Sequence, residues 1–212
     1  MARWKSRNAV SVARSSASNG GVVRGGVVPL GVIGPSLPPR AGGSLPGVTD
    51  RSLIIRAATA EDGTFLGDML CEAVSWSPEW KKKSRERIFS TPSTAHYLVG
   101  WPRDSDLGVL AEADGRPVGA TWLRFFPADD PGYGFVAPDV SELTIGVAAS
   151  WRGRGVGRAL LRAVAEQARA NGIRRISLSV ERKNFAQRLY LSEGYRITDS
   201  SDKDSDTMVK DL

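Results

Sequence analysis

A run of alternating glycines, Arg152-Gly-Arg-Gly-Val-Gly157, is the stretch of this chain best suited to bind a ligand. It follows an apolar stretch, ELTIGV, and precedes residues with the spacing of an amphipathic helix. Glycine lets a backbone approach a ligand with no Cβ in the way. A helix N-terminus directs unpaired N–H groups and the positive end of its dipole at an anion. These residues therefore predict a cradle for a diphosphate.

The spacing of the glycines excludes two common nucleotide sites. A dinucleotide fingerprint, G-x-G-x-x-G, would need a third glycine where the chain has Arg158 or Leu160. A triphosphate loop needs Lys and Ser or Thr after its last glycine, and neither follows Gly157. A tight turn without a ligand is the alternative, but three glycines beside a helix start weaken that helix and need another reason.

The pattern that the loop does fit is R-x-x-G-x-G, and from Glu142 to Ile197 the chain resembles the GNAT superfamily of acetyl-CoA-dependent N-acetyltransferases. The resemblance implies acetyl-CoA as the co-substrate, with its pyrophosphate on the loop amides, and it implies no metal. The residues that it implies for cofactor binding are Ile145, Val147, Arg152, Gly153, Arg154, Gly155, Val156, Gly157, Arg158 and Asn184.

A second part of the resemblance is NFAQRLYLSEGY, which begins at Asn184. The resemblance implies that Asn184 contacts the pantetheine arm, and that the Tyr190 hydroxyl lies near the thioester sulfur. Each residue also has a plain structural explanation. Asn184 suits a helix N-cap, and Tyr190 suits a core aromatic position.

Glu142 and Tyr190 are the two catalytic candidates. An amine must lose a proton to react, since its ordinary pKa is near ~10.4, and Glu142 heads the strand where relatives often carry a base. A carboxylate with a pKa near ~4.3 needs burial to become a useful base, and a strand-end salt bridge explains Glu142 equally well. The Val147 N–H would polarise the thioester carbonyl.

The residues that would choose the acceptor are the hardest to identify. The loop from Pro127 to Ser141 is longer than a typical connection, which indicates function or mobility. Its aspartates hint at a cationic acceptor. His96 is expected to be solvated or a capping residue. Four tryptophans could line an acceptor pocket or the core: Trp76, Trp80, Trp101 and Trp122.

Composition limits the remaining functions. The net charge of +6 comes almost entirely from residues 1–50, which carry six Arg or Lys and one acid. The rest of the chain therefore shows no excess of positive charge for nucleic-acid binding. Cys71 and His96 are the only residues of their types, which excludes a Cys/His zinc site. No run of 18 apolar residues predicts a membrane span, and we expect a cytoplasmic protein.

Two segments are expected from these patterns. Residues 1–50, rich in Gly, Pro and Arg, predict a disordered tail, whose alternatives are a start-site miscall or a transit-like segment. Residues 51–212 predict an α/β domain with a mixed, mostly antiparallel central sheet flanked by helices. Strands are expected over 52–56, 107–113, 117–125, 142–147, 175–180, 195–198 and 207–212, and helices over 59–74, 78–89, 155–171 and 184–192.

The sequence therefore predicts an N-acetyltransferase that moves an acetyl group to a primary amine by direct attack. The acceptor would be a small molecule or a protein amino group, with no nucleic-acid or membrane partner, and the chain could form a homodimer. A silent acyl-CoA-binding sensor is the alternative, because an intact glycine loop fits both functions.

Overall fold

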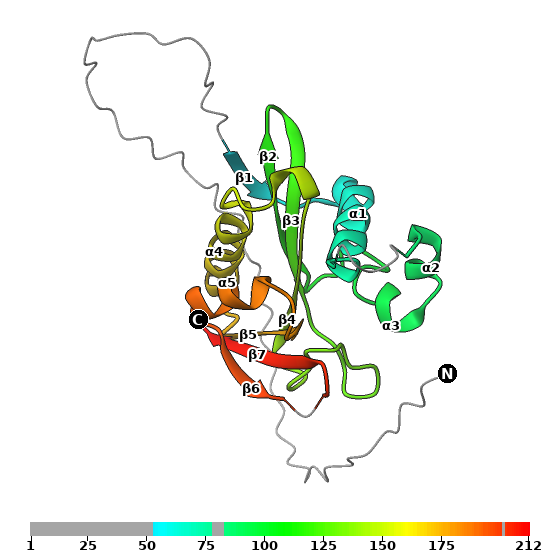
Figure 1. Ribbon diagram of the computed structural model, residues 1–212, viewed down its shortest axis with the longest axis vertical. Coiled ribbons are helices and arrows are strands. Elements are labelled where there is room, and N and C mark those ends of the chain that lie inside the picture. Colours follow the sequence, from blue (N-terminus) through cyan, green and yellow to red (C-terminus); the bar gives the residue numbers. More distant parts are fainter. Residues whose placement is uncertain (1–52, 78–82, 201) are drawn as a thin grey trace, which may run out of the picture. The chain divides into compact units, whose positions relative to one another are not determined.

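The computed structural model describes residues 53–77, 83–200 and 202–212. Within them, seven strands form one sheet in the order β1-β2-β3-β4-β5-β7-β6, flanked by helices (Figure 1). Neighbouring strands run antiparallel except β4 and β5, which confirms the predicted fold class. The strands are β1 (Leu53–Ala57), β2 (Leu107–Ala113), β3 (Arg116–Arg124), β4 (Ser141–Val147), β5 (Arg175–Glu181), β6 (Arg196–Asp199) and β7 (Ser205–Asp211). The helices are η1 (Ala60–Asp62), α1 (Gly63–Val74), α2 (Arg85–Phe89), α3 (Pro92–Ala95), η2 (Ala149–Trp151), α4 (Val156–Ala170) and α5 (Ala186–Ser192).

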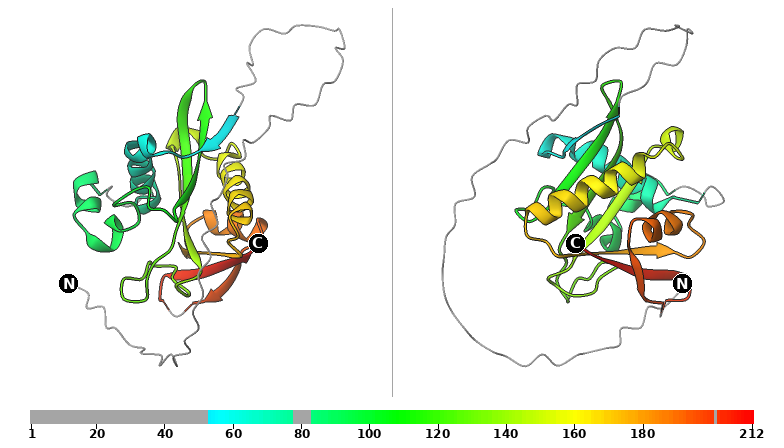
Figure 2. Two further views of the ribbon diagram at one scale, coloured as in Figure 1. Left: turned by 180° about the vertical axis from the view of Figure 1, so that it is seen from behind. Right: turned by 90° about the vertical axis from the view of Figure 1, so that its left-hand side faces the viewer.

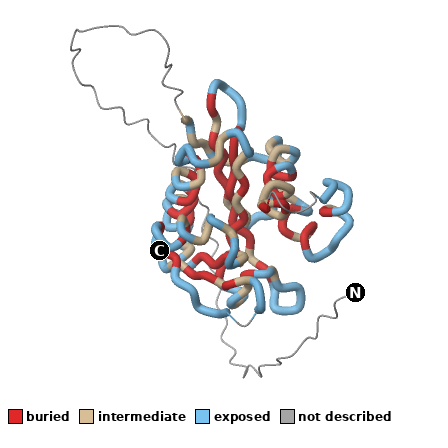
Figure 3. The backbone as a smooth tube through the Cα atoms, in the orientation of Figure 1, coloured by how far each residue is buried: buried red, intermediate tan, exposed pale blue. Residues whose placement is uncertain are grey.

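Helices cover both faces of the sheet, with α1 on one face and α4 on the other (Figure 2). Leu160, Val164 and Ala168 recur at helical spacing along α4, and all three are buried against the face that includes Val109 and Ala111. The central strands are accordingly buried along much of their length (Figure 3). Burial of this apolar stripe therefore fixes which face of α4 packs on the sheet.

The opposite face packs on α1. Leu66, Met69 and Leu70 are buried with Leu110 and Trp122. Because successive strand residues point to opposite faces, Leu110 joins this cluster while its neighbours in β2 join the other. The sheet therefore separates two hydrophobic cores. Alternate residues of β4 face one core or the other.

Two short segments show local turn and capping geometry that their residue types favour. Asp114 and Gly115 both have positive φ, 53° and 70°, as the two central residues of a type I′ hairpin require. At the start of η1 the Thr59 N–H donates to Asp62 Oδ2 over 2.8 Å as part of a capping box. These short signals set the hairpin between β2 and β3 and the start of η1.

The structure departs from the sequence predictions at several short elements, among them the 3₁₀ helix η2, which was not expected. The four-residue α3 was not expected, and α5 begins at Ala186, so that Asn184 precedes it. The predicted helix over 78–89 is α2 in its described part, while residues 78–82 lie outside the described residues, as does the predicted tail over 1–50. Among the described residues no helix is long and apolar enough to cross a membrane.

Candidate active site

The parallel strands β4 and β5 separate soon after they meet. They pair only at Ser141–Ile176 and Glu142–Ser177. Beyond Glu142, β4 keeps its pairing with β3 but has no pairing with β5. The sheet is therefore split along most of β4, and we call the space between the rest of β4 and β5 the strand gap.

The amides that face the strand gap follow from the alternation of an antiparallel pair. The Ala148 N–H bonds Val118 O, so every second residue back along β4 also bonds to β3. Ile145 and Val147 lie between those positions and direct their N–H groups away from β3. The gap therefore offers donors in a row to an extended ligand that carries amide oxygens.

The glycine loop continues directly from β4. Gly153 and Gly155 have φ of +73° and +82°, which L side chains rarely adopt, and a Cβ at either would meet no atom within 4 Å. Helix α4 then begins at Val156, with no side-chain cap. The first intrahelical bond runs from the Ala159 N–H to Gly155 O, so the N–H groups of the first turn have no helical partner. Open space, glycines and unpaired amides together fit an anionic group such as a pyrophosphate.

The start of α4 is held firmly in place. Val156 is buried in the core, and a Cβ at Gly157 would lie 3.3 Å from Leu189 Cδ2 on α5. Helix α4 therefore approaches α5 closely at this point, and its first turn cannot move away from the loop without losing core contacts.

Two arginines of the predicted cradle have their guanidinium groups in ion pairs. Arg152 Nη2 lies 2.6 Å from Glu72 Oε2 on α1, and its Nε donates to Val147 O over 3.1 Å. Arg158 Nε lies 2.9 Å from Glu193 Oε1, a carboxylate that Arg162 also binds. These side chains tie the loop to neighbouring helices, and their guanidinium groups already have acidic partners.

Glu142 lies on the α1 face of the sheet in a closed polar cluster. Its Oε1 accepts hydrogen bonds from the Tyr97 hydroxyl at 2.6 Å and from the Gly134 N–H at 2.8 Å. No cation among the described residues forms a salt bridge with it, which argues against the salt-bridge alternative. Glu142 is 3% exposed. Burial raises its pKa to about 7, against the opposing effect of the two donors.

The segment Gly132-Tyr133-Gly134 covers this carboxyl group. A Cβ at Gly132 would fall 2.1 Å from Glu142 Oε2, and a Cβ at Gly134 would fall 2.4 Å from the backbone of Leu178 on β5. Only glycine allows so close an approach at both positions. The long loop singled out from the sequence therefore packs closely over the Glu142 carboxyl group at the point where β4 and β5 separate. We call its Gly132–Gly134 segment the cover.

A stability measurement tests the environment of Glu142 without any substrate. Its pKa in the folded protein, about 7, exceeds the ordinary value of 4.5, so the folded state binds more protons between these pH values. Stability must then fall as pH rises through this window. As the pH rises through this window, the free energy of unfolding of the wild type should fall by about 3 kcal/mol relative to that of Glu142→Gln.

Urea unfolding of both proteins from pH 4 to pH 8 gives this difference. The exposed Glu166 of α4 provides a matched control, because Glu166→Gln removes the same charge from a solvated position. If the wild-type and Glu142→Gln curves stayed parallel across the window, the raised pKa of Glu142 would be wrong.

The second group of predicted residues lies near α5. Asn184 Oδ1 accepts a hydrogen bond from the Ala186 N–H over 2.9 Å, just before α5, whereas the N-cap position of α5 is Phe185. Tyr190 is buried in the core cluster of the α4 face, edge-on to Tyr195, and burial raises its pKa above the ordinary value. Tyr190 and Glu142 are thus not in contact and lie on opposite faces of the sheet.

Several residues around Glu142 were not identified from the sequence. Tyr97 and the Gly132–Gly134 cover show no periodic pattern, although the length of the loop did indicate function. His96, expected to be solvated or capping, is the C-cap residue of α3. Its side chain is largely buried, and its Nδ1 lies 3.0 Å from Asp130 Oδ1 of the long loop. Trp122 is fully buried and belongs to the core, while Trp80 lies outside the described residues.

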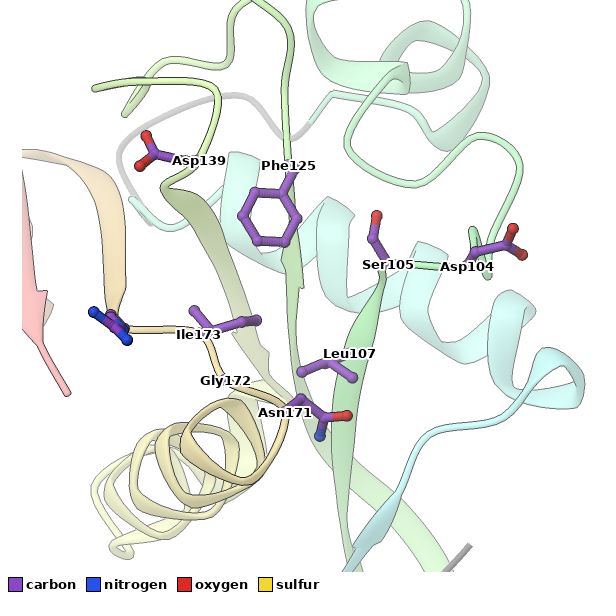
Figure 4. A pocket seen from close by; sticks show the side chains of 9 residues that line it. Asp104, Ser105, Leu107, Phe125, Asp139, Asn171, Gly172 and Ile173 are labelled. Atoms are coloured by element: carbon purple, nitrogen blue, oxygen red, sulfur yellow. The ribbon is translucent and has the colours of Figure 1, made fainter. Parts of the chain in front are cut away.

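A pocket of about 490 Å³ lies at the far end of α4 from the glycine loop (Figure 4). Leu107, Phe125 and Ile173 contribute apolar side chains to it, and Asp104 and Asp139 lie at its edge. It contains none of the predicted catalytic or cofactor-binding residues, since it adjoins the turn after α4 rather than the helix start. The pocket is therefore separate from the strand gap and from the glycine loop.

Comparison with known proteins agrees with this geometry. The model of the acetyltransferase (GNAT) family matches residues 69–195, which include β4, the glycine loop and α5. A mycothiol acetyltransferase of Corynebacterium glutamicum (strain R) is 30% identical over 131 residues, 61% of this chain and 39% of the relative. The chain thus spans about two fifths of the length of that relative.

Solved structures share the fold. The PaiA N-acetyltransferase from Thermoplasma acidophilum, in complex with coenzyme A, has a TM-score of 0.59 at 21% identity, over 76% of this chain and 99% of that one. The ribosomal-protein-alanine N-acetyltransferase from Brucella melitensis has a TM-score of 0.56 at 27% identity, over 75% of this chain and 99% of that one. With a family match across most of the ordered elements, this chain belongs to the GNAT family of acetyltransferases.

Proposed function

We propose that this protein is an N-acetyltransferase that moves an acetyl group from acetyl-CoA to a primary amine by direct attack. The observation that carries the proposal is the continuity of the strand gap with the glycine loop. Val147 ends β4, and Gly153 to Gly157 follow within ten residues. One bound molecule with an amide-bearing arm and a pyrophosphate could therefore use both sets of donors. Coenzyme A has both of these groups.

The cofactor would be held by backbone more than by side chains. The N–H groups of Val156, Gly157 and Arg158 would bind the pyrophosphate, with Gly153 and Gly155 keeping the surface open. Ile145 and Val147 would bind the pantetheine arm and the thioester carbonyl from the edge of β4. Arg152, Arg154 and Asn184 complete the proposed set; Arg154 lies over the Trp151 ring at 5.1 Å and presents its charge on the surface.

The reaction requires one proton to leave the amine and one to reach the sulfur. Acetyl-CoA, when bound, supplies a thioester whose carbonyl carbon can accept the amine lone pair. As the C–N bond forms and the C–S bond breaks, Glu142 would accept the amine proton. The Tyr190 hydroxyl would donate a hydrogen bond to the departing thiolate, which would then take its proton from solvent. The Val147 N–H would stabilise the negative charge on the carbonyl oxygen.

The pKa of Glu142 supports its role as the base. A general base works best with a pKa near the pH of operation, and burial brings this carboxyl group to about 7. Because the cover hides both carboxylate oxygens, the Gly132–Gly134 segment must shift to admit the amine or a bridging water. The acceptor would thus be selected partly by what can displace this segment.

An amine panel with acetyl-CoA tests the proposal. Release of free thiol is followed for small amines, aminoglycoside-type polyamines and peptides with free N-termini, and the acetylated product is identified by mass spectrometry. At least one amine should give stoichiometric acetylated product and thiol. Binding of acetyl-CoA without turnover of any amine would favour a silent sensor instead.

A further inference from the structure

The Tyr97 hydroxyl links the cover to the proposed base. It accepts a hydrogen bond from the Tyr133 N–H over 2.6 Å and donates to Glu142 Oε1, also over 2.6 Å. Tyr97 therefore connects the segment after α3, the long loop and β4 through a single oxygen atom. No motif or periodicity of the sequence indicates this residue.

The two oxygens of Glu142 are in different surroundings. Oε1 accepts from both Tyr97 and Gly134, whereas Oε2 is buried and has no hydrogen-bond partner in the described structure. An unpartnered buried carboxylate oxygen is costly, which calls for a reason. Because Gly132 has no Cβ, the loop backbone can lie directly against Oε2. One oxygen is thus fixed, and the other keeps its lone pairs for a further proton.

The Tyr97 ring is fixed as firmly as its hydroxyl. The ring centroids of His96 and Phe126 lie 4.9 Å and 5.0 Å from it, and that of Tyr133 stacks at 6.2 Å. The Trp122 indole donates to the Tyr97 carbonyl over 2.9 Å. Such packing leaves the hydroxyl little freedom, as a group that orients a catalytic carboxylate requires.

We infer that Tyr97 is a positioning residue: its hydroxyl holds Glu142 Oε1 so that Oε2 is the atom that accepts the proton of the acceptor amine. The inference rests on the proposed function, since it assigns a partner to the base of that reaction. Tyr97 touches neither acceptor nor cofactor in this scheme and acts through Glu142 alone.

The other groups around Glu142 have settled partners or carry no charge. Arg124 on β3 is opposite Glu142 in register, but its guanidinium is paired with Asp106. On β5 the nearest partner is Ser177, and the loop contributes Tyr133, whose hydroxyl donates to Ser93 Oγ over 3.1 Å. The Tyr97 hydroxyl is therefore the side-chain group whose removal should change the titration of Glu142 most.

Replacing Tyr97 by phenylalanine tests the inference. The ring stays, but a donor that favours the ionised carboxylate is lost, so the pKa of Glu142 should rise by about one to two pH units. The first readout is a ¹³C NMR titration of the glutamate carboxyl groups without substrate, in which the Glu142 signal is assigned by its loss in Glu142→Gln. The second is the acidic limb of the pH profile of kcat/KM. Tyr133→Phe is the matched control, because it removes a hydroxyl of the same loop cluster that does not contact Glu142.

The outcomes separate this inference from the proposed function. An unchanged pKa of Glu142 in folded Tyr97→Phe would overturn the positioning role. A shift seen by NMR in a protein that acetylates no amine would support the coupling and overturn the proposed function.

A second variant keeps the inference testable if Tyr97→Phe does not fold. In Gly132→Ala the new methyl group would overlap Oε2 and lie 2.8 Å from the Tyr97 hydroxyl oxygen, so it must displace Oε2 from its present position or move the cover. It should lower kcat and leave the KM for acetyl-CoA unchanged. An unchanged kcat would overturn the assignment of Oε2.

Discussion

Replacing Glu142 by glutamine is expected to lower kcat/KM for an accepted amine by ~10²–10⁴-fold, the usual contribution of a general base. Glutamine keeps the acceptor for the Tyr97 and Gly134 hydrogen bonds but cannot take up a proton. Because the carboxylate must be ionised to act, the wild-type rate should rise with pH through about 7, the pKa of Glu142. The variant should lose this limb.

Glu166→Gln again serves as the control, because Glu166 is exposed on α4 and its removal should leave the profile unchanged. The affinity for acetyl-CoA should be unchanged in Glu142→Gln, because Glu142 lies at the opposite end of β4 from the glycine loop. If the variant kept both the rate and the acidic limb, Glu142 would not be the base and the amine would lose its proton by another route.

Replacing Gly155 by valine should weaken coenzyme A binding by about 100-fold, the loss expected when one or two hydrogen bonds to a charged group are blocked. The new side chain would occupy the open space over the loop, where a Cβ meets no protein atom within 4 Å. The φ of +82° also strains any L side chain. Isothermal titration with coenzyme A measures the loss.

Backbone strain is separated from ligand exclusion by a second glycine. Gly172, after α4, has φ of +77° and equally open surroundings, but it lies at the opposite end of the helix. Gly172→Val should cost similar stability and leave coenzyme A affinity intact. Equal losses of affinity in both variants would mean that strain, rather than the cradle, accounts for the effect.

The cradle could be predicted from the sequence because its information is local. Gly153, Gly155 and the helix after them lie within one short stretch, and the positive φ values at both glycines are a conformation that glycine adopts readily. The same holds for the Asp114-Gly115 hairpin. What a short window of sequence could not show is that the Arg152 side chain pairs with Glu72, a residue 80 positions away.

The surroundings of Glu142 could not be predicted for the same reason. Its role depends on burial and on Tyr97, which lies 45 residues earlier in the chain. Periodicity describes how a strand or helix packs, but it carries no information on which loop closes over a strand end. The strand gap is also invisible in the sequence, because ELTIGV would read the same if β5 paired along its whole length.

The most direct test of the cofactor site is a coenzyme A titration followed by backbone amide shifts in ¹H–¹⁵N NMR spectra. The amides of the strand gap, Ile145 and Val147, and those of Gly153–Arg158 should show the largest changes. The turn after α4, Asn171–Arg174, which borders the separate pocket, should show little change. Changes confined to Asn171–Arg174, with none at the glycine loop, would contradict the assignment of the loop and strand gap as the acetyl-CoA site.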